Sequence, residues 1–136
     1  MGGRQQLGGR QKTIDPRQAR GRAGEEIARR YLRRRLYDII QTNYRSRYGE
    51  IDIIACRDGT VAFIEVKARR DKSFGEPFEA VGPRKQRQLR RLARMWLAEH
   101  QRQLQGQDLT FRFDVISMVL DKSNRPTEFM HIKNAF

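Results

Sequence analysis

The stretch GEIDIIACRDGTVAFIEVKA, residues 49–68, constrains the fold more than any other part of the chain. It contains two apolar runs separated by Arg57, Asp58, Gly59 and Thr60. An Asp-Gly pair between two such runs is typical of a two-residue β-turn. The stretch therefore predicts a β-hairpin in which Arg57 pairs with Thr60.

This register sorts the side chains of the hairpin into two faces, because side chains alternate along a strand. One face is wholly apolar and is expected to pack on a helix; it comprises Ile51, Ile53, Ala55, Ala62, Ile64 and Val66. On the other face, Asp52 falls opposite Glu65, and Glu50 falls opposite Lys67. Charged side chains are thus expected within the two strands that the sequence predicts most clearly.

The expected opposition of Asp52 and Glu65 is a local conflict. Directly opposed residues have Cβ atoms about 4.5–5.5 Å apart, and like charges there are destabilising. A divalent cation between the carboxylates would remove the conflict, and Lys67 would lie near enough to hold a phosphate or the attacking water. This combination suits phosphodiester hydrolysis. The alternative is an exposed strand face with ion pairs such as Glu50–Lys67, which are common and weakly stabilising. The spacing leaves both interpretations open.

The charge of the chain favours a polyanionic partner. Lysine and arginine total 29 against 16 acidic residues, which gives a formal net charge of +13. Each phosphate that such a protein neutralises releases counterions, so nucleic acid is the expected partner. A ribosome-like partner and an anionic membrane surface are the alternatives.

The chain lacks the sequence features of a secreted or membrane protein. No apolar run approaches the length of a membrane span, and the N-terminus has no apolar core of a signal peptide. The single cysteine, Cys56, cannot form an internal disulfide. We therefore expect a cytoplasmic protein with no membrane partner.

The remaining segments indicate one domain with a central sheet. Residues 1–19 are rich in Gly, Gln and Arg and predict a flexible basic arm ahead of a domain at residues 20–136. Apolar residues recur at helical spacing over residues 20–36 and again after Pro83. Residues 37–44 predict a short strand or link, residues 109–120 a strand, and the C-terminal tail a last strand or a cap on the core. This order is typical of an α/β or α+β sandwich.

Several motifs resemble one known nuclease group. The stretch GEIDIIACRDGTVAFIEVKAR resembles the hallmark of the PD-(D/E)XK nuclease superfamily, and within it the small YraN-like proteins, which are related to Holliday-junction resolvases. GRAGEEIARRYL (21–32) resembles the first helix of that family, and PRKQRQLRRLARMWL (83–97) the helix after the sheet. FRFDVISM and the closing IKNAF also fit. The resemblance implies a restriction-endonuclease-like α/β fold, a central mixed β-sheet flanked by helices with an αβββαβ core.

The resemblance also implies roles for individual residues. Asp52 and Glu65 would be metal ligands, completed by the backbone carbonyl of Val66, and Mg²⁺ or Mn²⁺ suits such oxygen ligands. Lys67 would orient water or phosphate. Glu25 would approach from the first helix as a further catalytic carboxylate. Glu50 is expected to play only a supporting or salt-bridging part.

Basic residues around these positions, together with one glutamine, are candidates for contact with nucleic acid. Those at the strand ends are expected to track the phosphate backbone, and those at the start of the second long helix to contact phosphate or the site. The two groups are Arg45, Arg47, Arg69, Arg70 and Lys72, and Lys85 and Gln86.

The function that these expectations favour is a metal-dependent endonuclease acting on DNA, with branched or junction DNA as a candidate substrate. Resolvases of the superfamily cut two strands symmetrically, so the resemblance also implies a homodimer. The alternatives are a non-catalytic DNA- or RNA-binding protein that keeps the nuclease fold, and an RNA-processing or ribosome-associated factor.

Overall fold

The computed structural model describes residues 15–71 and 81–136. In chain order, the elements of these segments are α1 (Pro16–Arg34), β1 (Asp38–Ser46), β2 (Gly49–Arg57), β3 (Thr60–Arg69), α2 (Pro83–Glu99), α3 (Gln101–Leu104), β4 (Thr110–Leu120) and β5 (Pro126–Ile132). The predicted order of elements is confirmed, and the C-terminal tail supplies a strand. None of the helices in these segments has the length and hydropathy needed to cross a membrane.

The first helix begins earlier than its apolar pattern predicted. Pro16 stands at the first helical position, and the Asp15 side chain accepts a hydrogen bond from the Arg17 amide at 2.9 Å. Both features are typical of helix starts. Residues 1–14 of the predicted arm lie outside the described residues.

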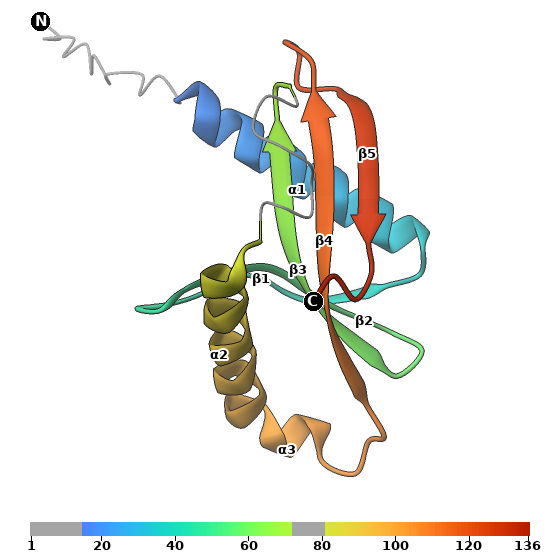
Figure 1. The fold of residues 1–136 in the computed structure, drawn as a ribbon. Coiled ribbons are helices and arrows are strands. Elements are labelled where there is room, and N and C mark those ends of the chain that lie inside the picture. The colour runs from blue at the N-terminus through green and yellow to red at the C-terminus, as the bar shows by residue number, and fades with distance from the viewer. Residues whose placement is uncertain (1–14, 72–80) are drawn as a thin grey trace, which may run out of the picture.

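The described strands form one mixed sheet in the order β1-β2-β3-β4-β5. Neighbouring strands are antiparallel except β3 and β4, which are parallel. A parallel pair needs a long crossover connection, and α2 and α3 lie within that connection (Figure 1). The fold is therefore the expected α/β arrangement, a mixed sheet flanked by helices that is consistent with a restriction-endonuclease-like core.

The hairpin turn has the predicted form. Asp58 and Gly59 have φ values of 49° and 73°, so both central residues are left-handed, as a type I′ turn requires. Arg57 pairs with Thr60, and the register continues to the pair of Ile53 and Ile64. The register predicted near the turn is confirmed.

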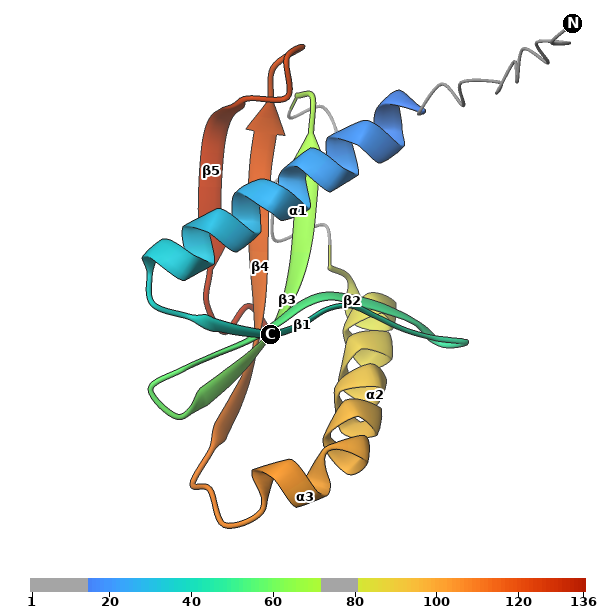
Figure 2. The ribbon, with the colours of Figure 1, turned by 180° about the vertical axis from the view of Figure 1, so that it is seen from behind.

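Each face of the sheet carries its own core. Figure 2 shows α1 lying across β3, β4 and β5, whereas α2 covers the opposite face. The core under α1 contains the buried residues Ala28, Leu32, Tyr37, Ile53, Ala55, Ala62, Ile64, Ile116, Met118 and Leu120. The core under α2 contains Tyr44, Ile51, Ile54, Val61, Phe63, Val81, Leu89, Leu92, Ala93, Trp96 and Val115. The predicted apolar face of the hairpin packs under α1, except for Ile51.

The assignment of Ile51 to the α1 face was wrong, because the alternation of β2 breaks at Asp52. Ile53 belongs to the α1 core, but Ile51 belongs to the α2 core. Across the strand, Asn43 of β1 has a left-handed φ of 53°, a conformation that asparagine tolerates better than most residues. The backbone of the β1–β2 ribbon is therefore irregular beside Asp52.

At the same point β2 parts from β3, so the predicted pairs Asp52–Glu65 and Glu50–Lys67 do not appear in the strand register. The pairing of β2 with β3 ends at Ile53, whereas β2 remains paired with β1 as far as Gly49. The far end of β3 remains paired with β4 instead, out to Arg69. Figures 1 and 2 show the β1–β2 ribbon turning away from the sheet.

A buried polar network ties α1 and the C-terminal segment to β4. Asp114 accepts hydrogen bonds from the Arg112 guanidinium and from the backbone amide of Asn134. Its Oδ2 also lies 2.8 Å from the Nε2 of His131. The other ring nitrogen of His131 lies 2.9 Å from the Tyr31 hydroxyl of α1. Burial opposes ionisation of Asp114, but the partners at His131 and Arg112 outweigh it and lower the pKa of this carboxyl.

A glycine allows α1 to lie close to β3. A Cβ atom on Gly24 would lie 2.6 Å from the Cβ of Ala68, closer than two such atoms can approach. Because Gly24 has no side chain, the helix can lie against Ala68 and Val66. The next residue of α1, Glu25, is thereby held near the point where β2 leaves β3.

Two alanine substitutions in α1 should therefore have opposite effects. Gly24→Ala should lower the free energy of unfolding by about 1–2 kcal/mol, since overpacking outweighs the gain in helix propensity. A Cβ on Gly21 would have no neighbour within 4 Å, so Gly21→Ala should raise the free energy of unfolding by about 0.5–1 kcal/mol. Urea unfolding of both variants measures the difference, and equal stabilisation by both would contradict the close approach of α1.

Candidate active site

Three carboxylates from two elements meet where β2 parts from β3. Glu25 of α1 and Glu50 and Asp52 of β2 each place a carboxylate oxygen within 4.8 Å of the others. We call this group the acidic cluster. The structure thus brings Glu25 and Asp52 together as the sequence predicted, and it adds Glu50 to them.

Asp52 holds its position through the backbone of the neighbouring strand. Its Oδ2 accepts the Val66 amide hydrogen at 2.8 Å, in the stretch where the β2 backbone no longer pairs with β3. A backbone amide that is half-buried needs an acceptor, and the Asp52 side chain supplies it. The implied role of the Val66 carbonyl as a metal ligand remains a prediction.

The acidic cluster cannot carry its full negative charge at neutral pH without compensation. Burial and the nearby charge of Glu65 raise the pKa of Asp52 to about 7, against the opposing hydrogen bond from Val66. Burial and the charge of Glu50 also raise the pKa of Glu25, although a hydrogen bond with Asn43 opposes this shift. A cation at the cluster would relieve both effects.

Glu65 lies beside the cluster and carries two lysines as partners. Its Oε1 lies 3.3 Å from the Nζ of Lys67 and 3.7 Å from the Nζ of Lys85, which comes from α2. Lys67 therefore pairs with Glu65 rather than with Glu50 as one interpretation of the sequence expected. Glu50 instead accepts a hydrogen bond from Arg45 at 2.9 Å.

The donor chemistry of this site fits a hard divalent cation. The acidic cluster offers only oxygen atoms, which suits Mg²⁺ or Mn²⁺. Burial and, secondarily, the charges of neighbouring carboxylates raise the pKa values of Asp52 and Glu25. Glu25, Glu50 and Asp52 would hold the cation. Glu65, which the sequence predicted as a ligand, adjoins this cluster without being part of it, and its role as a metal ligand remains a prediction.

The predicted nucleic-acid residues do not all lie at the site. Arg45 and Lys85 contact Glu50 and Glu65 and so border the site, and exposed Arg47 lies over the Tyr48 ring. Two others are engaged away from the acidic cluster: Arg70 donates to the backbone carbonyl of Asp121, and Gln86 to that of Val81. Arg69 is half-buried at the end of β3. Lys72 lies outside the described residues.

Two residues of the site were missed or underrated from the sequence. Glu50 was given a supporting part because Lys67 was expected opposite it, yet its spacing of two from Asp52 already placed both on one side of a strand. Asn43 was not considered, and it contacts Glu25 from β1. The only signal in the sequence was the tolerance of asparagine for a left-handed backbone.

Comparison with known proteins shows the family. The fold defines the class, an α/β protein with a core consistent with restriction endonucleases. The profile described as "Uncharacterised protein family UPF0102" matches residues 24–118, a span that includes the acidic cluster, Glu65, Lys67 and Lys85. The chain belongs to this family, the YraN-like group that its motifs resemble.

Curated relatives match this chain over most of their length. A UPF0102 protein of Nocardia farcinica is 44% identical over 123 residues, which cover 90% of this chain and 93% of the relative. A UPF0102 protein of Caldicellulosiruptor bescii is 41% identical over 116 residues, or 85% of this chain and 95% of the relative. One of Natranaerobius thermophilus is 44% identical over 119 residues, or 87% and 97%.

The raised pKa of Asp52 predicts how stability depends on pH in the absence of divalent cations. An ordinary aspartate titrates near 3.8 and folded Asp52 near 7, so the folded state holds this proton more tightly. The contribution of this proton to the free energy of unfolding is fully present below about pH 4 and is lost as pH rises through about 7. Asp52→Asn, which does not titrate, should therefore gain about 2–4 kcal/mol of unfolding free energy relative to wild type between about pH 4 and pH 8.

Chemical unfolding in EDTA at several pH values measures this gain. Glu26→Gln is the matched control, because the hydrogen bond from Arg29 lowers the pKa of Glu26. Ionised Glu26 therefore stabilises the fold at neutral pH, and this stabilisation is lost as pH falls. An Asp52→Asn variant that follows wild type at every pH would show that Asp52 is not held in a desolvated, like-charged setting.

Proposed function

We propose that this protein is a metal-dependent endonuclease that hydrolyses DNA phosphodiester bonds, with branched DNA as the substrate class that its motifs suggest. The observation that carries the proposal is the meeting of Glu25, Glu50 and Asp52 beside Lys67 and Lys85. Carboxylates and ammonium groups gathered at one point of a chain of net charge +13 suit the binding and cleavage of a polyanion.

The proposed chemistry divides the work between a cation and the side chains. Mg²⁺ or Mn²⁺ bound at the acidic cluster would polarise the scissile phosphate and lower the pKa of water. Glu25, Glu50 and Asp52 hold that charge in place. Lys67, whose side chain is 36% exposed, is accessible to a phosphate and offsets the negative charge that develops as the attacking oxygen joins phosphorus and the leaving oxygen departs.

Glu65 positions the lysines in this proposal. The carboxylate is 6% exposed, and its Oε1 pairs with the ammonium groups of both Lys67 and Lys85, so it holds them near the acidic cluster. It also adds negative charge beside Asp52, which strengthens the attraction for a cation. Removal of Glu65 should therefore impair both lysine placement and metal affinity.

Cleavage of branched or single-stranded DNA in the presence of Mn²⁺ tests the proposal. Asp52→Ala and Lys67→Ala should each reduce the cleavage rate by about 100-fold or more while DNA binding persists. Glu25→Ala should also reduce cleavage. Glu26→Ala is the matched control, because Glu26 pairs with Arg29 and Arg30 outside the acidic cluster and its removal should leave the rate unchanged.

Gel assays with and without EDTA separate the outcomes. Cleavage by wild type that stops in EDTA and is absent from the Asp52 and Lys67 variants supports the enzyme. Equal residual cleavage by wild type and Asp52→Ala, with binding intact in both, would instead support a non-catalytic DNA-binding protein.

A further inference from the structure

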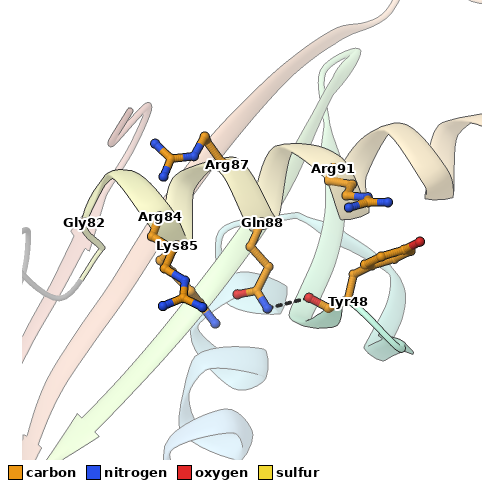
Figure 3. Close-up of a pocket in the computed structure, with 7 residues that line it drawn as sticks. All are labelled: Tyr48, Gly82, Arg84, Lys85, Arg87, Gln88 and Arg91. Carbon is orange, nitrogen blue, oxygen red and sulfur yellow. Dashed lines mark hydrogen bonds between the residues drawn. The ribbon is translucent and has the colours of Figure 1, made fainter.

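A basic pocket lies between the start of α2 and the turn that joins β1 to β2. It has a volume of about 540 Å³, within the range of small-molecule sites. Figure 3 shows its lining, which includes Tyr48 of the turn and Arg84, Lys85, Arg87, Gln88 and Arg91 of α2. The described residues that line this pocket include four cations and none with a carboxylate.

The wall of this pocket is held in place by contacts between α2 and the turn. Arg84, Gln88 and Arg91 follow helical spacing and share one side of α2. The Gln88 amide donates to the Tyr48 carbonyl (Figure 3), and the Arg91 guanidinium lies 3.5 Å from the centre of the Tyr48 ring. Gly49 has a φ of 130°, a backbone conformation that other residues rarely adopt, and a Cβ there would also press on the Gln88 amide, so glycine is favoured at this position.

The pocket adjoins the candidate active site at two points, one at Glu65 and one at the acidic cluster. Lys85 lines the pocket and also pairs with Glu65 at 3.7 Å. Tyr48, Gly49 and Glu50 are consecutive, so the aromatic wall of the pocket leads directly to a carboxylate of the cluster. A polynucleotide strand that places one phosphate at the cluster would therefore place a neighbouring nucleotide at the pocket.

We propose that the pocket binds one unpaired nucleotide next to the scissile phosphate, an inference that rests on the proposed nuclease function for the placement of that phosphate. Arg84 and Lys85 contact its phosphate, and its base packs against the Tyr48–Arg91 pair. A phosphate alone would leave most of the volume unfilled and would need no aromatic wall. Stacking on aromatic and guanidinium groups is how proteins bind unpaired bases of any sequence.

This geometry makes the protein selective for single-stranded segments, including those at branched DNA. A base within a duplex is already stacked and paired, and its extraction costs a few kcal/mol. The pocket would therefore favour strands whose bases are free. If it contacts only phosphates, paired and unpaired strands of equal charge should bind alike.

Fluorescence anisotropy in EDTA, where no cleavage occurs, tests the inference with the full chain. The probes are labelled oligothymidylate and an abasic sugar-phosphate strand of the same length and charge. Wild type should bind oligothymidylate about 5- to 100-fold more tightly. Tyr48→Leu should abolish that preference while leaving affinity for the abasic strand nearly unchanged, whereas Arg84→Ala should weaken the binding of both probes.

Two matched controls accompany these variants. Phe129→Leu removes an aromatic ring that is 38% exposed on β5, away from the pocket, and Arg34→Ala removes an exposed arginine of α1. Both should keep the base preference of wild type, and thermal unfolding confirms that every variant is folded.

Equal affinity of wild type for both probes, or a full preference in folded Tyr48→Leu, would overturn the inference. Because binding is measured without divalent metal ions, the base preference can persist even if the protein cleaves no DNA. Failure of the nuclease proposal is therefore distinguishable from failure of the pocket.

Discussion

The hydrogen bond from the Val66 amide to the Asp52 carboxylate, 2.8 Å long, is the interaction on which the site depends. It replaces a backbone partner at the point where β2 leaves β3, so the strands can part while the half-buried Val66 amide stays paired. The departing ribbon carries Glu50, and α1, close to β3 at Gly24, brings Glu25 to the same point. The loss of regular strand pairing and the formation of the acidic cluster are thus one structural event.

The cost of this arrangement is electrostatic, and the surroundings offset only part of it. Asp52 is desolvated beside other carboxylates, which a structure selected for stability alone would avoid. Lys67 and Lys85 balance Glu65, and Arg45 balances Glu50, but the pKa values of Asp52 and Glu25 stay raised. Carboxylates that meet at one point and have raised pKa values are characteristic of functional sites.

Local patterns predicted the fold well, and the site only in part. The Asp58–Gly59 turn and the helical spacing of Leu92 and Trp96 each depend on near neighbours in the sequence, and the structure confirms both. The direct opposition of Asp52 and Glu65 assumed that the hairpin stays paired to its end. The alternation of side chains cannot reveal where a strand leaves its neighbour. At this point β2 stays paired only with β1, and β3 only with β4. The meeting of Glu25 with Glu50 and Asp52 depends on the approach of α1 to the sheet, which no local pattern encodes.

A crystal structure with Mn²⁺, read by the anomalous scattering of the ion, tests the central claim most directly. The account predicts one anomalous peak at coordination distance from carboxylate oxygens of Glu25, Glu50 and Asp52. It also predicts that the Asp52–Val66 hydrogen bond persists. The absence of a peak at saturating Mn²⁺, or a peak elsewhere while these carboxylates remain without a cation, would contradict it.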